Sequence, residues 1–197
     1  MLFRSVKAKA DGYEDSDYSN EVVYFVDVAN AQWEVYSADG AATVSNEGGV
    51  VTIACTNNKA LVAMLKTGKA NFSFNAPKAS AADGGKMVII GRYGNNAVLF
   101  RPRGGTTGTN LQRYDYTTFG GQVLTTDSSA VNTFAAGDKL SVKWSGNTAS
   151  LYVNDVLQSS FDCSTYVANE TWEYCAGWCE TNAQGSPITL NNFTLDS

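Results

Sequence analysis

Aromatic and basic side chains gather in the middle of the sequence, between residues 91 and 116. On an extended strand Gln112, Tyr114 and Tyr116 would share one face, because successive side chains point to opposite sides. Aromatic rings stack on the C–H-rich faces of sugars, and arginines pair with carboxylates, sulfates or uronic acids. The pattern therefore predicts a glycan-binding face. Its expected contacts are Arg92, Tyr93, Arg101, Arg103, Tyr114 and Tyr116.

The residues of common hydrolytic mechanisms are missing or badly spaced. The sequence contains no histidine, which excludes Ser-His and Cys-His pairs. Glu170 and Glu173 are three residues apart, so on a strand their side chains would face opposite sides. The glycine-rich run 103–108 lacks the lysine and the following helix of a phosphate-binding loop. We expect a binding domain and not an enzyme.

A second group of aromatic residues, Trp172, Tyr174 and Trp178, alternates onto one face of another expected strand. Such rings either bind a ligand or fill the core between two sheets. The core interpretation is favoured here. It is also favoured for Trp144, which alternates with apolar residues, and for Trp33.

Four cysteines permit two disulfides. If residues 174–179 form a strand, Cys175 and Cys179 lie on one face about 13 Å apart, beyond the ~7 Å limit for a bridge. Cys163 is therefore expected to pair with Cys175 or Cys179, in an oxidising compartment. Zinc is disfavoured because there is no C-x2-C pair and no histidine. Buried free thiols, including Cys55, are the alternative.

The composition excludes several classes of partner. The net charge is −5 and no block of five like charges occurs, so the basic footprint of a nucleic-acid-binding protein is missing. No apolar run approaches ~18 residues, so we expect no membrane insertion. The acidic run 11–21 could hold a cation through Asp15, Asp17 and Ser19, but Asn20 replaces the glycine of a calcium loop. A solvated turn is the favoured interpretation.

These residues must be positioned by strands, because the hydrophobic pattern has period two almost throughout. Gly48–Gly49, Gly94–Asn95 and Gly146–Asn147 predict hairpin turns. Short antiparallel strands at this spacing indicate a sandwich or jelly roll. The expected strands are 31–37, 41–45, 50–55, 60–66, 71–75, 86–93, 97–103, 110–117, 139–144, 148–153, 173–179 and 188–195.

The segment 139–155 resembles the hairpin of concanavalin A-like and laminin G-like domains, with Asp155 in place of the usual glycine after Tyr152, Val153 and Asn154. The segment 188–195 resembles their last strand. The resemblance implies an all-β fold for residues 27–197: an antiparallel two-sheet jelly-roll sandwich of the concanavalin A-like type. This superfamily contains lectins, carbohydrate-binding modules, adhesion domains and glycosidases, and the Glu-x-Asp-x-x-Glu motif of its glycosidases is absent. Its members often carry a structural calcium, for which the candidate ligands are Asp27 with Asn191 or Asp196.

Residues 6–10 and 21–26, joined through Tyr18, Ser19 and Asn20, resemble the last two strands of a bacterial fibronectin type III domain. We therefore divide the chain into a remnant at 1–26 and a sandwich at 27–197. The resemblances imply a non-catalytic carbohydrate-binding or adhesion module of a secreted or cell-surface multidomain bacterial protein. Its partner would be a glycan or polysaccharide. The alternative is a module that binds another protein in a cell-surface or phage virion assembly.

Overall fold

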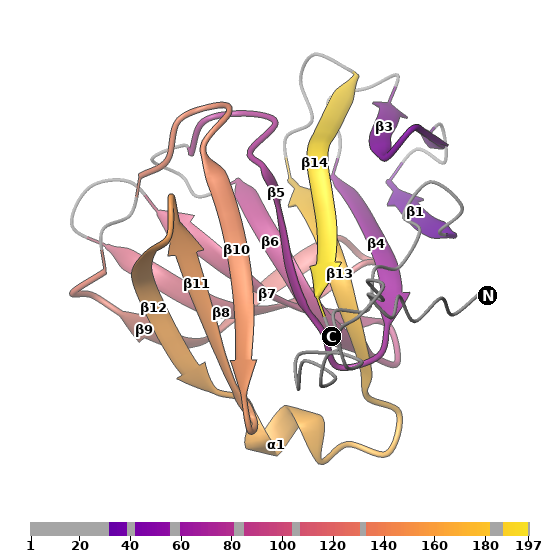
Figure 1. Ribbon diagram of the computed structural model, residues 1–197. Helices are drawn as coiled ribbons and strands as arrows, with labels where there is room; N and C mark the ends of the chain where they lie inside the picture. The colour runs from indigo at the N-terminus through magenta and orange to yellow at the C-terminus, as the bar shows by residue number, and fades with distance from the viewer. Residues whose placement is uncertain are drawn as a thin grey trace, which may run out of the picture.

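The computed structural model describes residues 32–38, 42–55, 60–80, 85–103, 107–130, 133–181 and 187–196. Within these ranges two antiparallel sheets of seven strands each lie face to face (Figure 1). The expected all-β jelly-roll sandwich is therefore confirmed. The segments 6–10 and 21–26 lie outside the described residues, so the fibronectin-type remnant and the division at residue 26 stay predictions. No helix among the described residues is long and apolar enough to cross a membrane.

Each sheet is completed by a strand from late in the sequence. The first sheet has the order β1 (Trp33–Ser37), β4 (Leu61–Thr67), β13 (Glu173–Glu180), β6 (Lys86–Tyr93), β7 (Asn96–Arg103), β8 (Gly108–Asp115), β9 (Gly120–Asp127). The second has the order β12 (Val156–Asp162), β11 (Thr148–Val153), β10 (Lys139–Ser145), β5 (Asn71–Asn75), β14 (Ile188–Asp196), β3 (Val50–Cys55), β2 (Ala42–Glu47). A short helix, α1 (Ser164–Val167), connects β12 to β13.

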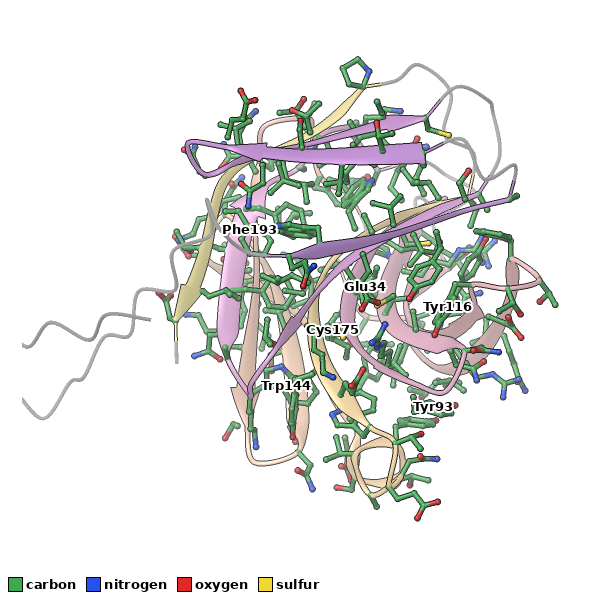
Figure 2. The ribbon with its side chains drawn as sticks, turned by 90° about the vertical axis from the view of Figure 1, so that its right-hand side faces the viewer. Glu34, Tyr93, Tyr116, Trp144, Cys175 and Phe193 are labelled. Atoms are coloured by element: carbon green, nitrogen blue, oxygen red, sulfur yellow. The ribbon has the colours of Figure 1, made fainter. Side chains whose placement is uncertain are left out.

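The main core fills the space between the sheets. Phe72, Phe74 and Phe193 stack with nearly parallel rings, and Trp178 meets Phe74 edge-on at 6.1 Å. Trp33 and Trp178 are buried here, while Trp144 and Trp172 pack against this core from its margin. The prediction of a core position is confirmed for Trp33 and Trp178, and Trp144 and Trp172 are partly buried at the edge of that core. Figure 2 shows Phe193 and Trp144 toward the second sheet, and Tyr116 on the far side of the first.

The first sheet curls strongly on itself. Tyr36 of β1 and Tyr116, which follows β8, have ring centroids only 4.1 Å apart, although five strand spacings separate β1 from β8 in the sheet order. In a flat sheet that separation would be about 24 Å. We call the face inside this curl, which points away from the second sheet, the curled face. Its buried side chains form a second cluster that includes Val62, Met64, Met87, Ile89, Ala97, Leu99, Tyr114, Tyr116, Cys175 and Cys179.

All the expected strands are present, with ends that differ by a few residues. The elements not expected are β9, β12 and α1. β9 begins with two glycines and has mostly exposed side chains, so its sequence is typical of a loop. It forms because β8 offers a partner edge, with Tyr114 opposite Gly121 and Thr109 opposite Asp127. Tertiary pairing, not local propensity, creates this strand.

Candidate ligand-binding site

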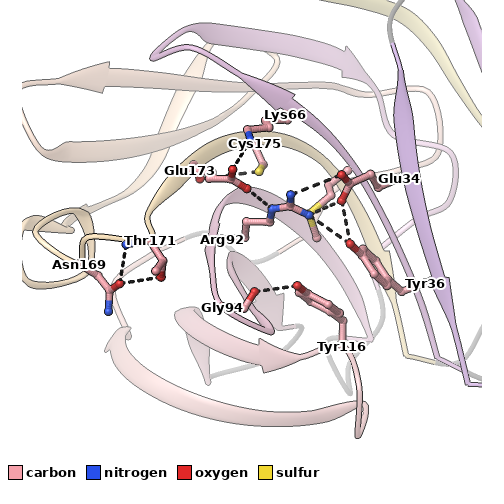
Figure 3. A network of polar contacts seen from close by, with 11 residues as sticks. Glu34, Tyr36, Lys66, Arg92, Gly94, Tyr116, Asn169, Thr171, Glu173 and Cys175 are labelled. Carbon is pink, nitrogen blue, oxygen red and sulfur yellow. Dashed lines mark hydrogen bonds and ion pairs between the residues drawn. The ribbon is translucent and has the colours of Figure 1, made fainter.

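A network of charged side chains lies at one end of the curled face, centred on Arg92 of β6 (Figure 3). The Arg92 Nε donates to Glu173 of β13, and its Nη1 donates to Glu34 of β1. Nη1 also lies 3.1 Å from the Tyr36 hydroxyl, which itself donates to Glu34 Oε2 at 2.7 Å. Lys66 of β4 forms an ion pair with Glu173. Four neighbouring strands thus contribute one linked set of groups.

Strand alternation explains why β1 delivers two of these side chains. Trp33 and Val35 pack into the core between the sheets, so Glu34 and Tyr36 must point to the opposite, curled face. The curl of the sheet then brings β1 within reach of Arg92.

A glycine, Gly91, allows the packing that places Arg92 of β6 beside Glu173 of β13. Arg92 and Glu173 are directly opposite each other on β6 and β13. The preceding residues are Gly91 and Trp172, and a Cβ on Gly91 would lie 2.3 Å from the Trp172 ring. Only glycine therefore lets Trp172 pack beneath β6, and this contact places Arg92 beside Glu173.

The four charged side chains of the network differ in their exposure to solvent. The exposed fraction of the side chain is 15% for Arg92 and 40% for Glu34, 26% for Glu173 and 59% for Lys66. The hydrogen bond from Lys66, together with those from Arg92, lowers the pKa of Glu173. Burial and the hydrogen bond to Glu34 raise the pKa of Tyr36. Both carboxylates are therefore held as hydrogen-bond acceptors, and that of Glu34 remains accessible.

Five of the six predicted contact residues lie on the curled face. Arg92, Tyr114 and Tyr116 are placed there with Arg101, whose Nη1 donates to Gln112 Oε1 at 3.2 Å. Arg103 follows two residues later on the same strand, and so shares this face. The sixth, Tyr93, packs against the core between the sheets. Whether any of them touches a ligand stays a prediction.

The two predicted stacking tyrosines are largely covered. Tyr114 is 2% exposed and Tyr116 9% exposed. The Tyr116 hydroxyl donates to the Gly94 carbonyl at 2.7 Å, and Phe119 meets the Tyr114 ring edge-on at 6.2 Å. Burial raises the pKa of Tyr114. Of the aromatic rings on this face, the half-buried Tyr36 and Phe119 are nearer to solvent.

Sequence analysis missed the most accessible members of the network: Glu34, Tyr36, Lys66 and Glu173. A signal existed for the first two, because they alternate with the core residues Trp33 and Val35 on the first expected strand. There was no signal that this edge strand would meet the end of β8. That contact depends on the curl, which the spacing of residues along one strand does not encode.

The predicted disulfide of Cys163 with Cys175 or Cys179 is wrong, because the four cysteines form no disulfide and all are buried. Cys163 lies in the core between the sheets, whereas Cys175 and Cys179 lie on the curled face. The first sheet therefore separates the expected partners. Burial raises the pKa of Cys163 to about 11 and that of Cys175 to about 12, so these thiols stay protonated and poorly reactive.

The expected calcium site combines Asp27 with Asn191 or Asp196, and Asp27 lies outside the described residues, so the site stays a prediction. Asn191 pairs with Asn75 and Asp196 with Asn71, at opposite ends of β5 and about 13 Å apart, so the two alternatives are separate positions. Within the described part of the chain, no group of three or more acidic or cysteine side chains is arranged to hold a metal.

No known protein-family model matches this sequence, and no curated protein does. Several solved structures share the fold. A GlcNAcα1-4Gal-releasing endo-β-galactosidase from Clostridium perfringens aligns over 91% of this chain with a TM-score of 0.51 and 8% identity, and the chain spans 63% of that enzyme. The carbohydrate-binding module CBM66 from Bacillus subtilis aligns over 85% of this chain and 98% of its own, with a TM-score of 0.50 and 12% identity.

A third solved structure is a protein of unknown function with a galectin-like fold from Bacillus subtilis. It aligns over 86% of this chain and 90% of its own, with a TM-score of 0.50 and 10% identity. At these identities the three structures show the fold alone. They agree with the concanavalin A-like sandwich expected from the hairpin 139–155.

Proposed function

We propose that the domain is a non-catalytic carbohydrate-binding module whose ligand contacts the Arg92 end of the curled face. One observation carries the proposal: the accessible carboxylate of Glu34 lies beside the Tyr36 ring and within one hydrogen-bonded network. Sugar sites combine an aromatic surface with a few fixed polar groups, as this arrangement does. The shared fold with a carbohydrate-binding module supports the proposal.

The network also argues against hydrolysis, although a glycosidase shares the fold. Glycoside hydrolysis needs one carboxyl group that is protonated at working pH. Glu34 and Glu173 both accept hydrogen bonds from Arg92, and Lys66 lowers the pKa of Glu173. The lowered pKa of Glu173 is the opposite of what a general acid needs, and Glu34 is held by hydrogen bonds from Arg92 and Tyr36, so we propose binding without turnover. Release of reducing ends from a bound polysaccharide would contradict this.

The test is a binding screen of the full chain against soluble and insoluble polysaccharides and a glycan array. Tyr36→Ala should weaken binding about tenfold or more, because it removes a ring and a hydroxyl from the site. Tyr152→Ala is the matched control, because Tyr152 lies on the second sheet beneath Lys143. Equal affinities for the two variants would refute the assigned site. Repeating the screen with calcium and with a chelator tests the expected structural ion.

A protein-interaction module is the second candidate. It is favoured by Val156 and Leu157, which are 62% and 54% exposed on the edge strand β12, where another chain could add a strand. A glycan screen without hits would favour this candidate. A photoreactive residue at position 157 would then identify the partner by cross-linking. The secreted or cell-surface location stays a prediction. A disulfide would have supported it, and the four cysteines form none.

A further inference from the structure

We infer that the ligand at the Arg92 end of the curled face is a neutral, hydroxyl-rich glycan and not a uronic acid or sulfated sugar. The inference rests on the proposed function and specifies its ligand. Arginines on an aromatic face favour an anionic sugar when the sequence is considered alone. The contacts of Arg92 lead to the opposite conclusion.

The charges at this end of the face cancel. Glu34, Lys66, Glu173 and Arg92 come from β1, β4, β13 and β6, and each is paired with a neighbour of opposite sign. Two are acidic and two are basic, so the network has no net charge. A carboxylate or sulfate entering here would meet the exposed carboxylate of Glu34, and at Lys66 it would meet a cation already paired with Glu173.

The guanidinium of Arg92 is already occupied. Its Nε donates to Glu173, its Nη1 donates to Glu34 and Tyr36, and its Nη2 donates to Glu34 at 3.4 Å. The side chain is only 15% exposed. Arg92 therefore holds two carboxylates in place and does not present a bidentate site to an anion.

The groups that remain accessible suit sugar hydroxyls. Glu34 is 40% exposed and can accept a hydrogen bond from a hydroxyl, and Lys66 is 59% exposed and can donate one. A hydroxyl is both donor and acceptor, so neighbouring hydroxyls of one sugar can satisfy both groups without adding charge.

Arg101 and Arg103 do not change the charge balance at this end. Arg92 lies opposite Ala97 on β7, and these two arginines follow four and six residues later on that strand, about 13 Å and 20 Å away. These distances exceed the Debye length of about 8 Å at physiological salt. The two ends of the face therefore attract ligands independently.

Glu34→Gln in the full chain tests the inference, because its effect has opposite signs for the two ligand classes. The probes are galactan and a neutral β-glucan against polygalacturonate and dextran sulfate, in titration calorimetry. For a neutral ligand the variant should lose between about tenfold and a hundredfold in affinity, because an ionised acceptor is lost. For an anionic ligand it should gain affinity, because a repelling charge is removed.

Glu47→Gln is the matched control, with the same charge change at an exposed position on β2. Thermal unfolding shows whether each variant is folded, and the salt dependence of the wild-type chain gives a measurement that needs no variant. Neutral binding should change less than twofold between about 0.05 M and 0.5 M salt, because no charge is neutralised. Binding to the anionic probes alone, weakened by salt and strengthened by Glu34→Gln, would overturn the inference while keeping a glycan-binding function. No binding to any probe would overturn both.

Discussion

The two outward faces of this sandwich use polar residues in different ways. On the outer face of the second sheet, short side chains pair locally between adjacent strands, as in Ser73 with Thr194 and Ser150 with Ser160. On the curled face of the first sheet, long side chains meet across several strands, and Arg92 reaches Glu34 over the strands between them. The outer face is a solvated surface, whereas the curled face holds a built network above a buried cluster.

The comparison shows that curvature decides which polar residues can form a site. The second sheet places serines, threonines and lysines side by side, yet its contacts stay between neighbouring strands. The first sheet carries fewer polar side chains but curls until its edge strand approaches Tyr116. Four predictions test this difference.

The largest effect is expected where the curl depends on close backbone contact. A Cβ on Gly177 of β13 would lie 2.1 Å from the Ala63 carbonyl oxygen of β4, which no side-chain rotation can relieve. Gly177→Ala should lower the free energy of unfolding by about 3 kcal/mol or more, measured by denaturant titration. Gly68→Ala, where nothing lies within 4 Å of the added carbon, should change it by less than about 0.5 kcal/mol. Equal effects would show that the close approach of β4 and β13 is not required.

The second-largest effect on stability is expected from replacing Arg92, the charge at the centre of the network. Arg92→Met leaves Glu34 and Glu173 without their guanidinium, and should destabilise the fold by about 2–3 kcal/mol. Lys143→Met on the outer face should change stability by less than about 0.5 kcal/mol. Adding Glu34→Gln to Arg92→Met should recover part of the loss, because one unpaired charge disappears. No recovery in chemical denaturation would mean that the arginine acts through packing alone.

A smaller effect should appear in the pH dependence. The pKa of Glu173 is lowered in the folded protein by Lys66 and Arg92, so its contribution to stability is present above the unfolded pKa of about 4.3 and is lost as pH falls through the folded value. Glu173→Gln should therefore cost about 1–2 kcal/mol at pH 7, and the difference from wild type should shrink steadily as the pH falls below about 4.3. Melting temperatures of both proteins across this range provide the measurement. A difference that does not shrink as the pH falls would contradict the pairing.

The smallest effect is expected on the outer face. Ser150→Ala removes a hydrogen bond of 2.7 Å to Ser160, but water can replace it at this position. Stability should change by less than about 0.5 kcal/mol and glycan affinity should not change. A variant of Ser150 with clearly weaker glycan binding would place a ligand on the second sheet and remove the contrast between the faces.

Sequence patterns predicted correctly which residues share a face of one strand, but not which distant segments contact each other. The alternation of Gln112, Tyr114 and Tyr116 correctly placed all three on one face, and the shared face of Cys175 and Cys179 was also predicted correctly. Period two fixes such relations within one strand. The error with Cys163 arose because no local pattern tells which side of a sheet a distant segment will approach.

The same limit explains why the accessible residues of the site could not be predicted from the sequence. Glu34 and Arg92 are 58 residues apart in sequence, and their contact depends on the strand order and on the curl. Tyr114 and Tyr116, by contrast, were predicted to stack on a sugar because they share one strand face with Gln112. The curl covers Tyr116 by bringing Tyr36 over it, whereas the turn between β8 and β9 places Phe119 against Tyr114.

The positions of β13 and β14 also bear on how this chain folds during synthesis. β13 lies between β4 and β6, and β14 lies between β5 and β3, so each sheet consists of two separate halves until residues 173–196 have left the ribosome. At about 5–20 residues per second, the earlier strands wait for several seconds with unpaired edges that are open to aggregation unless a chaperone covers them. A chain that ended just before residue 173 would consist of four partial sheets in place of a shorter domain.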